Sequence, residues 1–443
     1  MRILIYSYNY HPEPIGIAPL MTELAEGLVR RGHEVRVVTG MPNYPQRQIY
    51  KEYRGKLYTT EVRNGVTIQR SYVWIRPKPG FMDRVMLEGS FVLTSIFQAL
   101  NGWRPDVILL TAPPLPACVP ATLLGWLHDC PVVLNLQDIL PDAAIATGLI
   151  RNKLLVRVFR SLEQFAYRHA TKISVIAEGF ESNLRQKGVE PEKISLIRNW
   201  VDVNFIRPMP KENNVFRDAH GLNGKFVVLY AGNIALTQGL ETVVESARHL
   251  SHLPDIEIVI VGEGRALESL QRMKQIWKTD NVRLLPFQPR EMLPTMLAAA
   301  DVSLVVQKRN AICFNMPSKI PTILASGRPI LASVPQHGTA AKAVRQSQGG
   351  IVIPPENPKR LAQAIQALYE NPLRCALLGR QGLQFAVEHY AFEQILTRYE
   401  SLFASLISQP PALPVVPVGV AQNCNESPIL ASSLLGYSKK NER

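Results

Sequence analysis

The chain has 443 residues, of which 46% are apolar and 19% are charged, and its net charge is +13. This composition excludes a disordered chain, and the length favours two domains over one core. The positive charge favours an anionic partner, such as an acidic membrane surface or a phosphorylated small molecule. No lysine- and arginine-rich run with interleaved aromatic residues occurs, so a nucleic-acid partner is disfavoured.

The cysteine pattern bears on the compartment and on metal binding. The five cysteines are far apart in the sequence and form no CxxC pair and no cysteine–histidine cluster with zinc spacing. An odd number of cysteines argues against a disulfide framework and favours a reducing compartment. The first residues lead into a strand pattern and not into a signal peptide. We therefore expect a cytoplasmic protein without a metal centre.

The N-terminal residues predict a strand, a loop and a helix. Arg2–Tyr6 contains the short apolar run of a strand that is buried on both faces. Apolar residues repeat at helical spacing from Leu20 to Leu28, and Pro19 suits the first turn of that helix. The loop Pro12–Gly16 is therefore expected at the carboxyl end of a strand, where ligands bind in open α/β sheets. From the loop alone, a ligand site and an ordinary turn are equally open.

Strand and helix patterns alternate through the first half of the chain, which predicts a parallel sheet with right-handed crossovers. The expected strands are Arg2–Tyr6, Glu34–Thr39, Val66–Arg70, Val107–Leu110, Val132–Asn135, Lys172–Ile176 and Ile194–Ile197. Prolines interrupt the apolar stretch from Val107 to Leu127, so a strand, a turn and a buried helix are expected there rather than a membrane span. Val85–Leu100 is also apolar, and a core helix is favoured over a helix on a membrane surface.

The pattern breaks after Asn199, and the polar, proline-containing segment that ends at Asn214 predicts a linker. Alternation then begins again, which predicts a second domain of the same kind. Its expected strands are Lys225–Tyr230, Ile256–Val261, Val282–Leu285, Val302–Val306, Pro329–Ser333 and Gly350–Ile353. Helical patterns follow to Ile407, and a proline-rich and polar tail from Gln409 is expected to be disordered.

Two loops of the second domain combine glycines with a following helix. The first begins with Gly232 and Asn233 and runs through Gln238, and glycines before a helix suit an anion. The second contains Gly262 and Arg265, where a tight turn is an equally open explanation.

Another loop of the second domain brings two cations and a hydroxyl near one strand end. Gln307 and Lys308 follow the strand, and Ser318 stands where a helix N-cap would be, just before Lys319. This combination suits a diphosphate, and we favour that role over a solvated basic loop. In the first domain, Gln137 and Asp138 follow a strand. Asp138 could orient a substrate hydroxyl or accept its proton, or it could cap the next segment.

These motifs together resemble the retaining glycosyltransferases of family 4 and, within them, the branch linked to colanic acid and related exopolysaccharide synthesis. The resemblance is carried by Pro12–Gly16, Gly32–Val35, Gln137–Asp142, Gly232–Gly239, Gln307-Lys308, Pro317–Lys319 and Ala325–Pro329. It implies an α/β protein of the GT-B fold, in which two Rossmann-like, doubly wound parallel-sheet domains face each other across a cleft. The expected parts are an acceptor-side domain (1–200), a linker (201–214), a nucleotide-sugar-binding domain (215–384), a helix returning to the first domain (385–408) and a disordered tail (409–443).

The reaction that the resemblance implies is metal-independent transfer of a hexosyl group from a GDP- or UDP-sugar to a lipid-linked exopolysaccharide oligosaccharide, with retention at the anomeric carbon. No cofactor is expected. The implied catalytic residues are Asp138, Lys308 and Lys319; the donor site would be Gly16, Gly232, Asn233, Gln238, Gly262, Arg265, Lys308, Ser318 and Lys319; and Gln137 and Asp138 would face the acceptor. The basic surface and Val85–Leu100 would hold the enzyme at the inner face of the plasma membrane.

The chain also departs from the family. Many members carry an arginine and a lysine where this chain has Asn233 and Gln238, and two glutamates where it has Phe314 and Thr322. Lys308 and Lys319 are expected to replace these missing charges. Two other functions stay open: an NDP-sugar epimerase of the same fold, which would convert the donor without an acceptor, and a non-catalytic nucleotide-sugar-binding protein.

Overall fold

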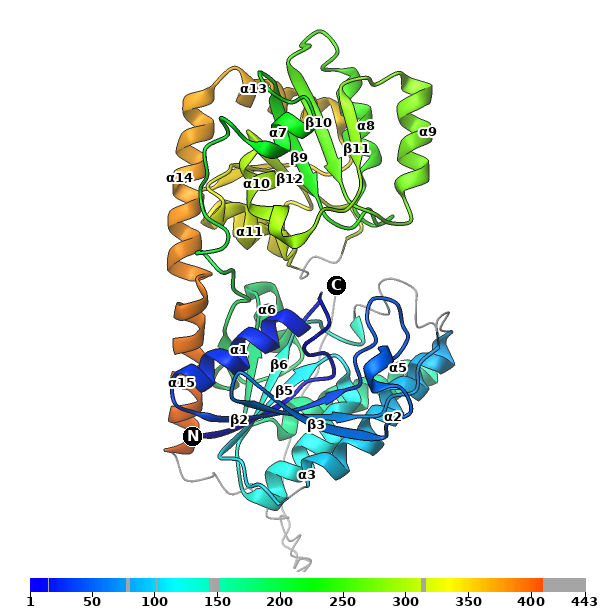
Figure 1. Cartoon of the computed structure of the whole chain (residues 1–443), viewed down its shortest axis with the longest axis vertical. Coiled ribbons are helices and arrows are strands. Elements are labelled where there is room, and N and C mark those ends of the chain that lie inside the picture. The colour runs from blue at the N-terminus through cyan, green and yellow to red at the C-terminus, as the bar shows by residue number, and fades with distance from the viewer. Residues whose placement is uncertain are drawn as a thin grey trace, which may run out of the picture. The chain divides into compact units, whose positions relative to one another are not determined.

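Two largely parallel β-sheets form the framework of the protein in the computed structural model, which describes residues 1–14, 16–76, 80–100, 102–142, 145, 152–311 and 316–408 (Figure 1). The first sheet has the order β3-β4-β2-β1-β5-β6-β7-β8, and β3 is antiparallel to β4 while the other neighbours are parallel. Its strands are β1 (Arg2–Tyr6), β2 (Glu34–Gly40), β3 (Tyr58–Arg63), β4 (Val66–Ser71), β5 (Val107–Ala112), β6 (Val132–Leu136), β7 (Lys172–Val175) and β8 (Ile194–Leu196).

The second sheet is parallel throughout, with the order β11-β10-β9-β12-β13-β14. Its strands are β9 (Phe226–Ala231), β10 (Ile256–Val261), β11 (Val282–Leu285), β12 (Val302–Val306), β13 (Ile330–Ser333) and β14 (Gly350–Ile353). Counted along the chain, this is the 3-2-1-4-5-6 order of doubly wound folds that bind nucleotides. The expected pair of doubly wound parallel-sheet domains is therefore confirmed.

Helices cover both faces of each sheet, because the strands are apolar on both sides. The helices around the first sheet are α1 (Ala18–Arg30), α2 (Phe81–Ala99), α3 (Cys118–His128), α5 (Lys153–His169), α6 (Glu178–Gln186) and α15 (Phe392–Ile407). Those around the second are α7 (Val215–Ala219), α8 (Glu241–Arg248), α9 (Leu267–Trp277), α10 (Leu293–Ala298), α11 (Lys319–Ala325), α12 (Thr339–Gln346), α13 (Pro358–Tyr369) and α14 (Pro372–His389). Within the described ranges, no helix is both long and apolar enough to cross a membrane.

All the strands expected from the sequence are present, with ends that differ by at most two residues, but β3 was not expected. Its residues alternate between half-buried and exposed at the edge of the sheet, so it lacks the continuous apolar run of the other strands. A signal was available in Asn64-Gly65, which connects β3 to β4 with both residues at positive φ. Asn-Gly between alternating residues is a strong short-range indication of a hairpin.

The strand order places particular loops where ligands bind in such sheets. In the first sheet, β1 lies between β2 and β5, and in the second, β9 lies between β10 and β12. The chain therefore turns to opposite sides after these central strands, which opens a crevice at their carboxyl ends. The loop Pro12–Gly16 follows β1, the loop from Gly232 follows β9, and the loop with Lys308 follows β12.

The last helix, α15, packs on the first sheet although α14 before it packs on the second (Figure 1). Tyr399 and Phe403 are fully buried in the same apolar cluster as Ile3 and Ile5 of β1. The Tyr399 hydroxyl also accepts a hydrogen bond of 2.9 Å from the side-chain amide of Asn135 in β6. The end of the chain's second half is thereby tied to the core of the first.

Ion pairs at the end of α1 hold α15 as well. Arg31 donates to Glu400 at 2.7 Å and to Glu393 at 2.9 Å, and the His33 ring lies 2.8 Å from the other oxygen of Glu400. These partners lower the pKa of Glu400 from its usual 4.5, with the hydrogen bond from Arg31 as the largest cause. His33 of the motif Gly32–Val35 therefore has a structural role in docking α15.

Replacing Glu400 with glutamine is expected to destabilise the protein by about 1 kcal/mol at neutral pH, the scale of a charged pair that is partly exposed. Because the pKa of Glu400 is lowered in the folded state, its contribution is complete above 4.5 and is lost as the pH falls through the folded value. Thermal unfolding of both proteins across this range should show their melting temperatures converge in acid. Glu393→Gln, on the same helix but more exposed, should cost less. A difference that is constant with pH would contradict this role.

Candidate active site

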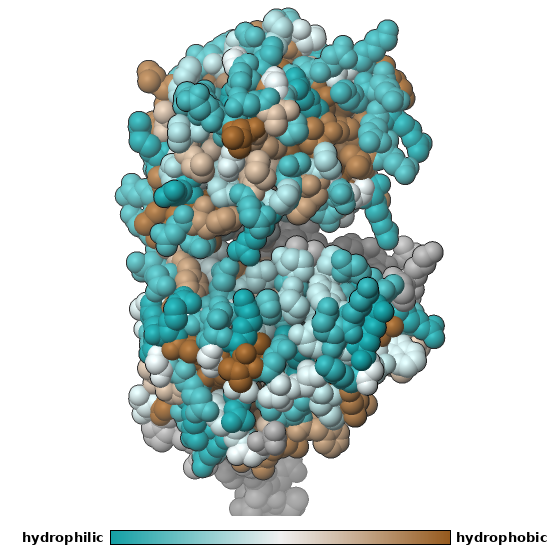
Figure 2. Space-filling model, viewed as in Figure 1, coloured by the Kyte–Doolittle hydropathy of each residue, from teal (hydrophilic) through white to brown (hydrophobic). Residues whose placement is uncertain are grey.

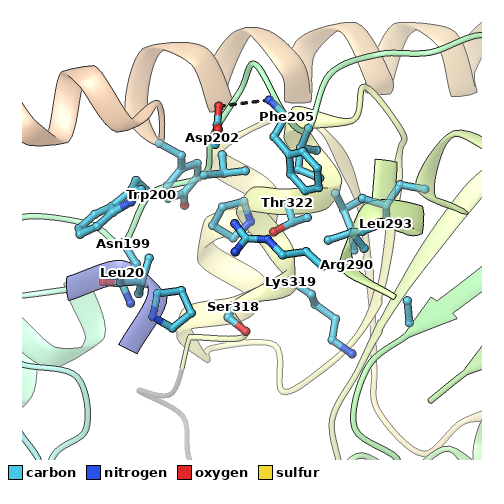
Figure 3. A pocket seen from close by; sticks show the side chains of 18 of the residues that line it. Leu20, Asn199, Trp200, Asp202, Phe205, Arg290, Leu293, Ser318, Lys319 and Thr322 are labelled. Atoms are coloured by element: carbon cyan, nitrogen blue, oxygen red, sulfur yellow. Dashed lines mark hydrogen bonds between the residues drawn. The ribbon is translucent and has the colours of Figure 1, made fainter. Parts of the chain in front are cut away.

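A pocket of about 510 Å³ lies where loops from both halves of the chain meet (Figure 3). Three parts of the chain line it. The segment after β1 contributes Gly16, Leu20 and Glu23, and the segment that connects β8 to β9 contributes Asn199, Trp200 and Phe205. The second half contributes Arg290, Met316, Ser318, Lys319 and Thr322. Of the residues expected in the site, Gly16, Ser318 and Lys319 line this pocket. The other expected site residues are not part of its lining.

Lys319 has the most unusual environment of these residues. It is the first residue of α11, and Figure 3 shows its side chain extending away from Trp200. Its Nζ atom is buried and has no hydrogen-bond partner in the described part of the chain, and it lies 3.7 Å from the centre of the Tyr230 ring. Burial lowers the pKa of Lys319 to about 7. A buried ammonium without a counter-ion is costly unless an anion joins it, so this group suits an anionic ligand.

Lys308 is in a different situation. Its ammonium lies 3.6 Å from the carboxylate of Glu241 at the start of α8, and its side chain is partly exposed. Its backbone N–H donates to the carbonyl of Thr237 at 3.2 Å, which ties the loop after β12 to the loop after β9. Lys308 therefore has a partner already, whereas Lys319 does not within the described residues.

The loops after β9 and β10 are packed directly on each other. The backbone N–H of Ile234 donates to Glu263 at 2.8 Å, and that of Ala266 donates to Ile234 at 3.0 Å. A Cβ on Gly262, whose φ is +151°, would overlap the carbonyl oxygen of Gly232. A Cβ on Gly232 would lie 3.1 Å from the Lys319 Nζ atom. Gly262 thus lets the loop after β10 pack closely on the loop after β9, and Gly232 lets the loop after β9 approach the lysine closely.

The remaining donor-side candidates are less constrained. Asn233 and Arg265 are exposed, and Gln238 is half-buried. The hydroxyl of Tyr230 donates to the backbone carbonyl of Asn233 at 2.8 Å, so this loop is fixed through its backbone. Ser318 occupies the N-cap of α11 as expected, but its hydroxyl makes no capping hydrogen bond and lies in the pocket.

A carboxylate that the sequence analysis did not select holds the loop after β1. Glu13 is buried, and it accepts hydrogen bonds from the backbone N–H groups of Asn43 and Tyr44 at 2.8 and 2.9 Å and from the Asn9 side chain at 2.6 Å. Burial raises the pKa of Glu13, while these donors act in the opposite direction. Glu13 thus anchors the loop, and Gly16 at its far end faces the pocket.

Replacing Gly16 with alanine tests whether that position contacts a ligand. Gly16 has φ of +75°, and nothing lies within 4 Å of the place where a Cβ would be. Gly188 has φ of +82° with the same open space, and it lies outside the pocket lining. Both alanine variants should therefore lose about 1 kcal/mol of stability. We expect only Gly16→Ala to lose turnover, by about tenfold or more, because the methyl group meets the bound donor. Equal activities of the Gly16→Ala and Gly188→Ala variants would indicate that Pro12–Gly16 is an ordinary turn.

Gln137 and Asp138 lie at the end of β6. The side-chain amides of Gln137 and Asn199 bond to each other in both directions, at 2.7 and 3.1 Å, and Gln137 also donates to Asn135 at 2.8 Å. Gln137 therefore positions Asn199, which lines the pocket. Asp138 is exposed to solvent on one side, yet surrounding protein atoms desolvate it partly and raise its pKa, opposed by the charge of Arg84.

An ion pair across the pocket was also missed by sequence reasoning. The carboxylate of Glu23 accepts a hydrogen bond of 2.8 Å from the indole N–H of Trp200 and lies 3.4 Å from the guanidinium of Arg290. Glu23 belongs to α1 and Arg290 to the second half, so this pair joins the two halves at the pocket wall. No local pattern relates residues so far apart in sequence.

Two expectations fall outside what the structure describes. Phe314 and the tail from Gln409 lie outside the described residues, whereas Thr322 lines the pocket.

Where the chain is described, no three histidine, cysteine, aspartate or glutamate side chains come together as metal ligands would.

Comparisons with known proteins agree with this arrangement. Residues 16–200 match the glycosyl transferase 4-like domain, and residues 212–385 match glycosyl transferases group 1. WcaI of Escherichia coli K12, named as a colanic acid biosynthesis glycosyl transferase, is 31% identical over 374 residues, which cover 83% of this chain and 91% of WcaI. WbjE of Pseudomonas aeruginosa, named as a glycosyltransferase, is 25% identical over 70% of this chain and 75% of its own.

The fold is also found in solved structures. The crystal structure of HepE from Anabaena in complex with UDP has a TM-score of 0.69 at 18% identity and covers 92% of this chain and 100% of its own. HepE in complex with UDP-glucose has a TM-score of 0.67 at the same identity and coverage. Both domain families match this chain, and its strand orders agree with those of the same fold. The chain therefore belongs to the family 4 glycosyltransferases, which have the GT-B fold.

Proposed function

We propose that this glycosyltransferase moves a hexosyl group from a nucleoside diphosphate sugar to a glycan acceptor in exopolysaccharide synthesis. The observation that carries the proposal is the buried ammonium of Lys319, which has no partner among the described residues and stands in a pocket also lined by Gly16. A diphosphate would supply the missing counter-charge. The name of WcaI and the UDP and UDP-glucose in the HepE crystals support this choice of product and donor class.

In the proposed reaction, the bond between the anomeric carbon and the diphosphate oxygen breaks, and negative charge develops on the diphosphate. Lys319 stabilises this charge, with Lys308 and the loop from Gly232 to Gln238 beside it. The acceptor hydroxyl attacks the anomeric carbon on the same face, and the departing phosphate oxygen takes its proton. The configuration is retained, and the protein cations serve in place of a metal ion.

The acceptor is proposed to approach from the first half of the chain. Asp138 stands at the carboxyl end of β6 with a partly desolvated carboxylate, which suits it to orient an acceptor hydroxyl. Lipid-linked sugars are the proposed acceptors, and the cytoplasmic face of a membrane is the proposed location.

The test is a transfer assay with GDP-, UDP- and dTDP-hexoses and polyprenyl-diphosphate-linked sugars as acceptors. We expect nucleotide release that depends on the acceptor, persists with EDTA and gives a product of the donor's anomeric configuration. Asp138→Asn should lose transfer but keep the rise in melting temperature that the donor causes. Conversion of the donor without an acceptor would indicate an epimerase instead. Donor binding with no release under any acceptor would indicate a binding protein.

A further inference from the structure

Strand β6 carries one amide side chain in an otherwise apolar run. Asn135 is fully buried, and so are the other residues of β6, Val132–Leu136. Figure 2 shows many hydrophilic side chains on the outer surface of the molecule, where water can satisfy them. A buried amide is costly unless each of its polar atoms finds a partner, so the partners of Asn135 indicate what it does.

The partners of Asn135 come from three different parts of the first half. Its side-chain nitrogen donates to the hydroxyl of Ser174 in β7 at 3.0 Å and to the hydroxyl of Tyr399 in α15 at 2.9 Å. Its side-chain oxygen accepts a hydrogen bond of 2.8 Å from the amide of Gln137. Both amide hydrogens of Asn135 are therefore engaged, and the orientation of the group is fixed.

Gln137 connects Asn135 to the pocket. Besides its bond to Asn135, the Gln137 nitrogen donates to the side-chain oxygen of Asn199 at 3.1 Å, and the Gln137 oxygen accepts from the Asn199 nitrogen at 2.7 Å. Both hydrogens of the Gln137 amide are thus used, which leaves none for a ligand. We call Tyr399, Asn135, Gln137 and Asn199 the amide chain, which extends from the buried face of α15 to the pocket wall.

Asn199 is the member of the amide chain that lines the pocket (Figure 3). Its side chain forms one donated and one accepted hydrogen bond with Gln137, and no other among the described residues. One N–H and one oxygen lone pair therefore remain for a ligand. A sugar hydroxyl both donates and accepts, so it matches these two groups, whereas an ionised phosphate oxygen can only accept.

We propose that Asn199 hydrogen-bonds a hydroxyl of a substrate sugar, and that Gln137, Asn135 and Tyr399 are positioning residues that orient it. This inference rests on the proposed function, because it assigns a sugar contact in the same pocket. A few polar groups in fixed orientations give a pocket its specificity, and a side chain that is already oriented loses little entropy when the ligand binds. The packing of α15 on the first sheet is thereby coupled to sugar recognition.

The experiment determines three constants for each variant in the assay described above. They are the affinity for the nucleoside diphosphate hexose, the affinity for the nucleoside diphosphate alone, and the KM of the polyprenyl-diphosphate-linked acceptor. We expect Asn199→Ala to weaken the first or the third by about tenfold and to leave the second unchanged. Weaker binding of the donor hexose would assign the hydroxyl to the transferred sugar, and a raised acceptor KM would assign it to the acceptor.

The matched control for Asn199→Ala is Asn183→Ala. Asn183 is also half-buried, and its amide donates to Asp142 at 3.1 Å, but it lies outside the pocket lining. All three constants of this variant should equal those of the wild type. Measurements are made below the melting temperature of every variant, so that each is compared in its folded state.

The positioning role is tested by combining substitutions. Gln137→Met removes the amide but keeps an unbranched side chain, and Tyr399→Phe removes only the hydroxyl. Each should weaken the same constant as Asn199→Ala does, by about threefold or more. Neither should weaken it further in the Asn199→Ala background, because both act through Asn199. Tyr6→Phe is the control for Tyr399→Phe, since its buried hydroxyl bonds to Ser95 in the same half; it should lose stability but keep all three constants.

The outcomes separate this inference from the proposed function. Transfer by the wild type, with all three constants unchanged in Asn199→Ala, would overturn the inference and leave the proposed function intact. Equal weakening of the nucleoside diphosphate alone would overturn it in favour of a contact with the nucleotide. Effects of Gln137→Met and Tyr399→Phe that persist in full in the Asn199→Ala background would overturn the positioning role. A wild type that transfers no sugar from any donor would overturn the proposed function and this inference with it.

Discussion

Replacing Lys319 with methionine is expected to lower turnover by on the order of a hundredfold, the scale for removing one preorganised group that stabilises charge in the transition state. Methionine keeps an unbranched side chain in the same space next to Tyr230 and removes the ammonium. The measurement is turnover at saturating donor, together with donor affinity. Lys359→Met, on the exposed side of α13, is the matched control and should be fully active.

The same substitution should make the ligand-free protein more stable. The pKa of Lys319 is lowered from 10.5 to about 7 by burial, so the folded state binds fewer protons than the unfolded state between these values. The stability contribution of this lysine is therefore unfavourable below its folded pKa, and it improves as the pH rises from 7 toward 10.5. Lys319→Met removes this effect, so its melting temperature at neutral pH should exceed that of the wild type. A variant that is both inactive and less stable would indicate a structural role for the lysine instead.

The two lysines of this site show what the sequence could and could not reveal. Lys308 and Lys319 look equivalent in the sequence, since each stands near the same strand end and next to polar residues. The fold gives Lys308 a partner in Glu241 and leaves Lys319 with none among the described residues. That difference arises from contacts between loops that are distant in sequence, and no periodicity or spacing encodes it.

The framework was predictable because its signals are local. Buried parallel strands need continuous apolar runs, and β1, β9 and β10 are apolar on both faces. Alternation with helices then fixed the fold class. The edge strand β3 was missed because its residues alternate between half-buried and exposed, so it has no continuous apolar run. Asn64-Gly65 nevertheless marks the turn that connects it to β4.

The parts of the site that were not predictable involve pairs of distant residues. Glu23 and Arg290 join the two halves, and Glu13 reaches across to the backbone of Asn43 and Tyr44. In the sequence, Glu13 and Glu23 look like ordinary polar residues of their own segments. Tertiary packing determines which of them is buried and which groups it forms hydrogen bonds or ion pairs with.

Replacing Gly262 with alanine is expected to lower the free energy of unfolding by about 3 kcal/mol or more, since it combines backbone strain with overpacking. Its φ of +151° is a conformation that residues with a side chain rarely adopt. In addition, the new methyl group would overlap the carbonyl of Gly232 and lie 3.5 Å from the Ile234 side chain. Gly224→Ala is the control, because Gly224 has φ of +73° and open space around it, so only strain is added there.

The consequence for activity follows from the contact between Gly232 and Lys319. If the loop after β9 must move to admit the methyl group, the backbone that lies against the Lys319 ammonium moves with it, and the diphosphate would lose its preorganised partner. Folded Gly262→Ala should therefore bind the donor more weakly than Gly224→Ala does, in calorimetry at a temperature where both are folded. Lys319→Met and Gly262→Ala would then both lose turnover but change stability in opposite directions. This contrast distinguishes a charge that destabilises the empty site from a backbone contact that supports it. Urea unfolding in which Gly262→Ala matches Gly224→Ala would show that the loop yields to the methyl group and that the two loops are not rigidly packed.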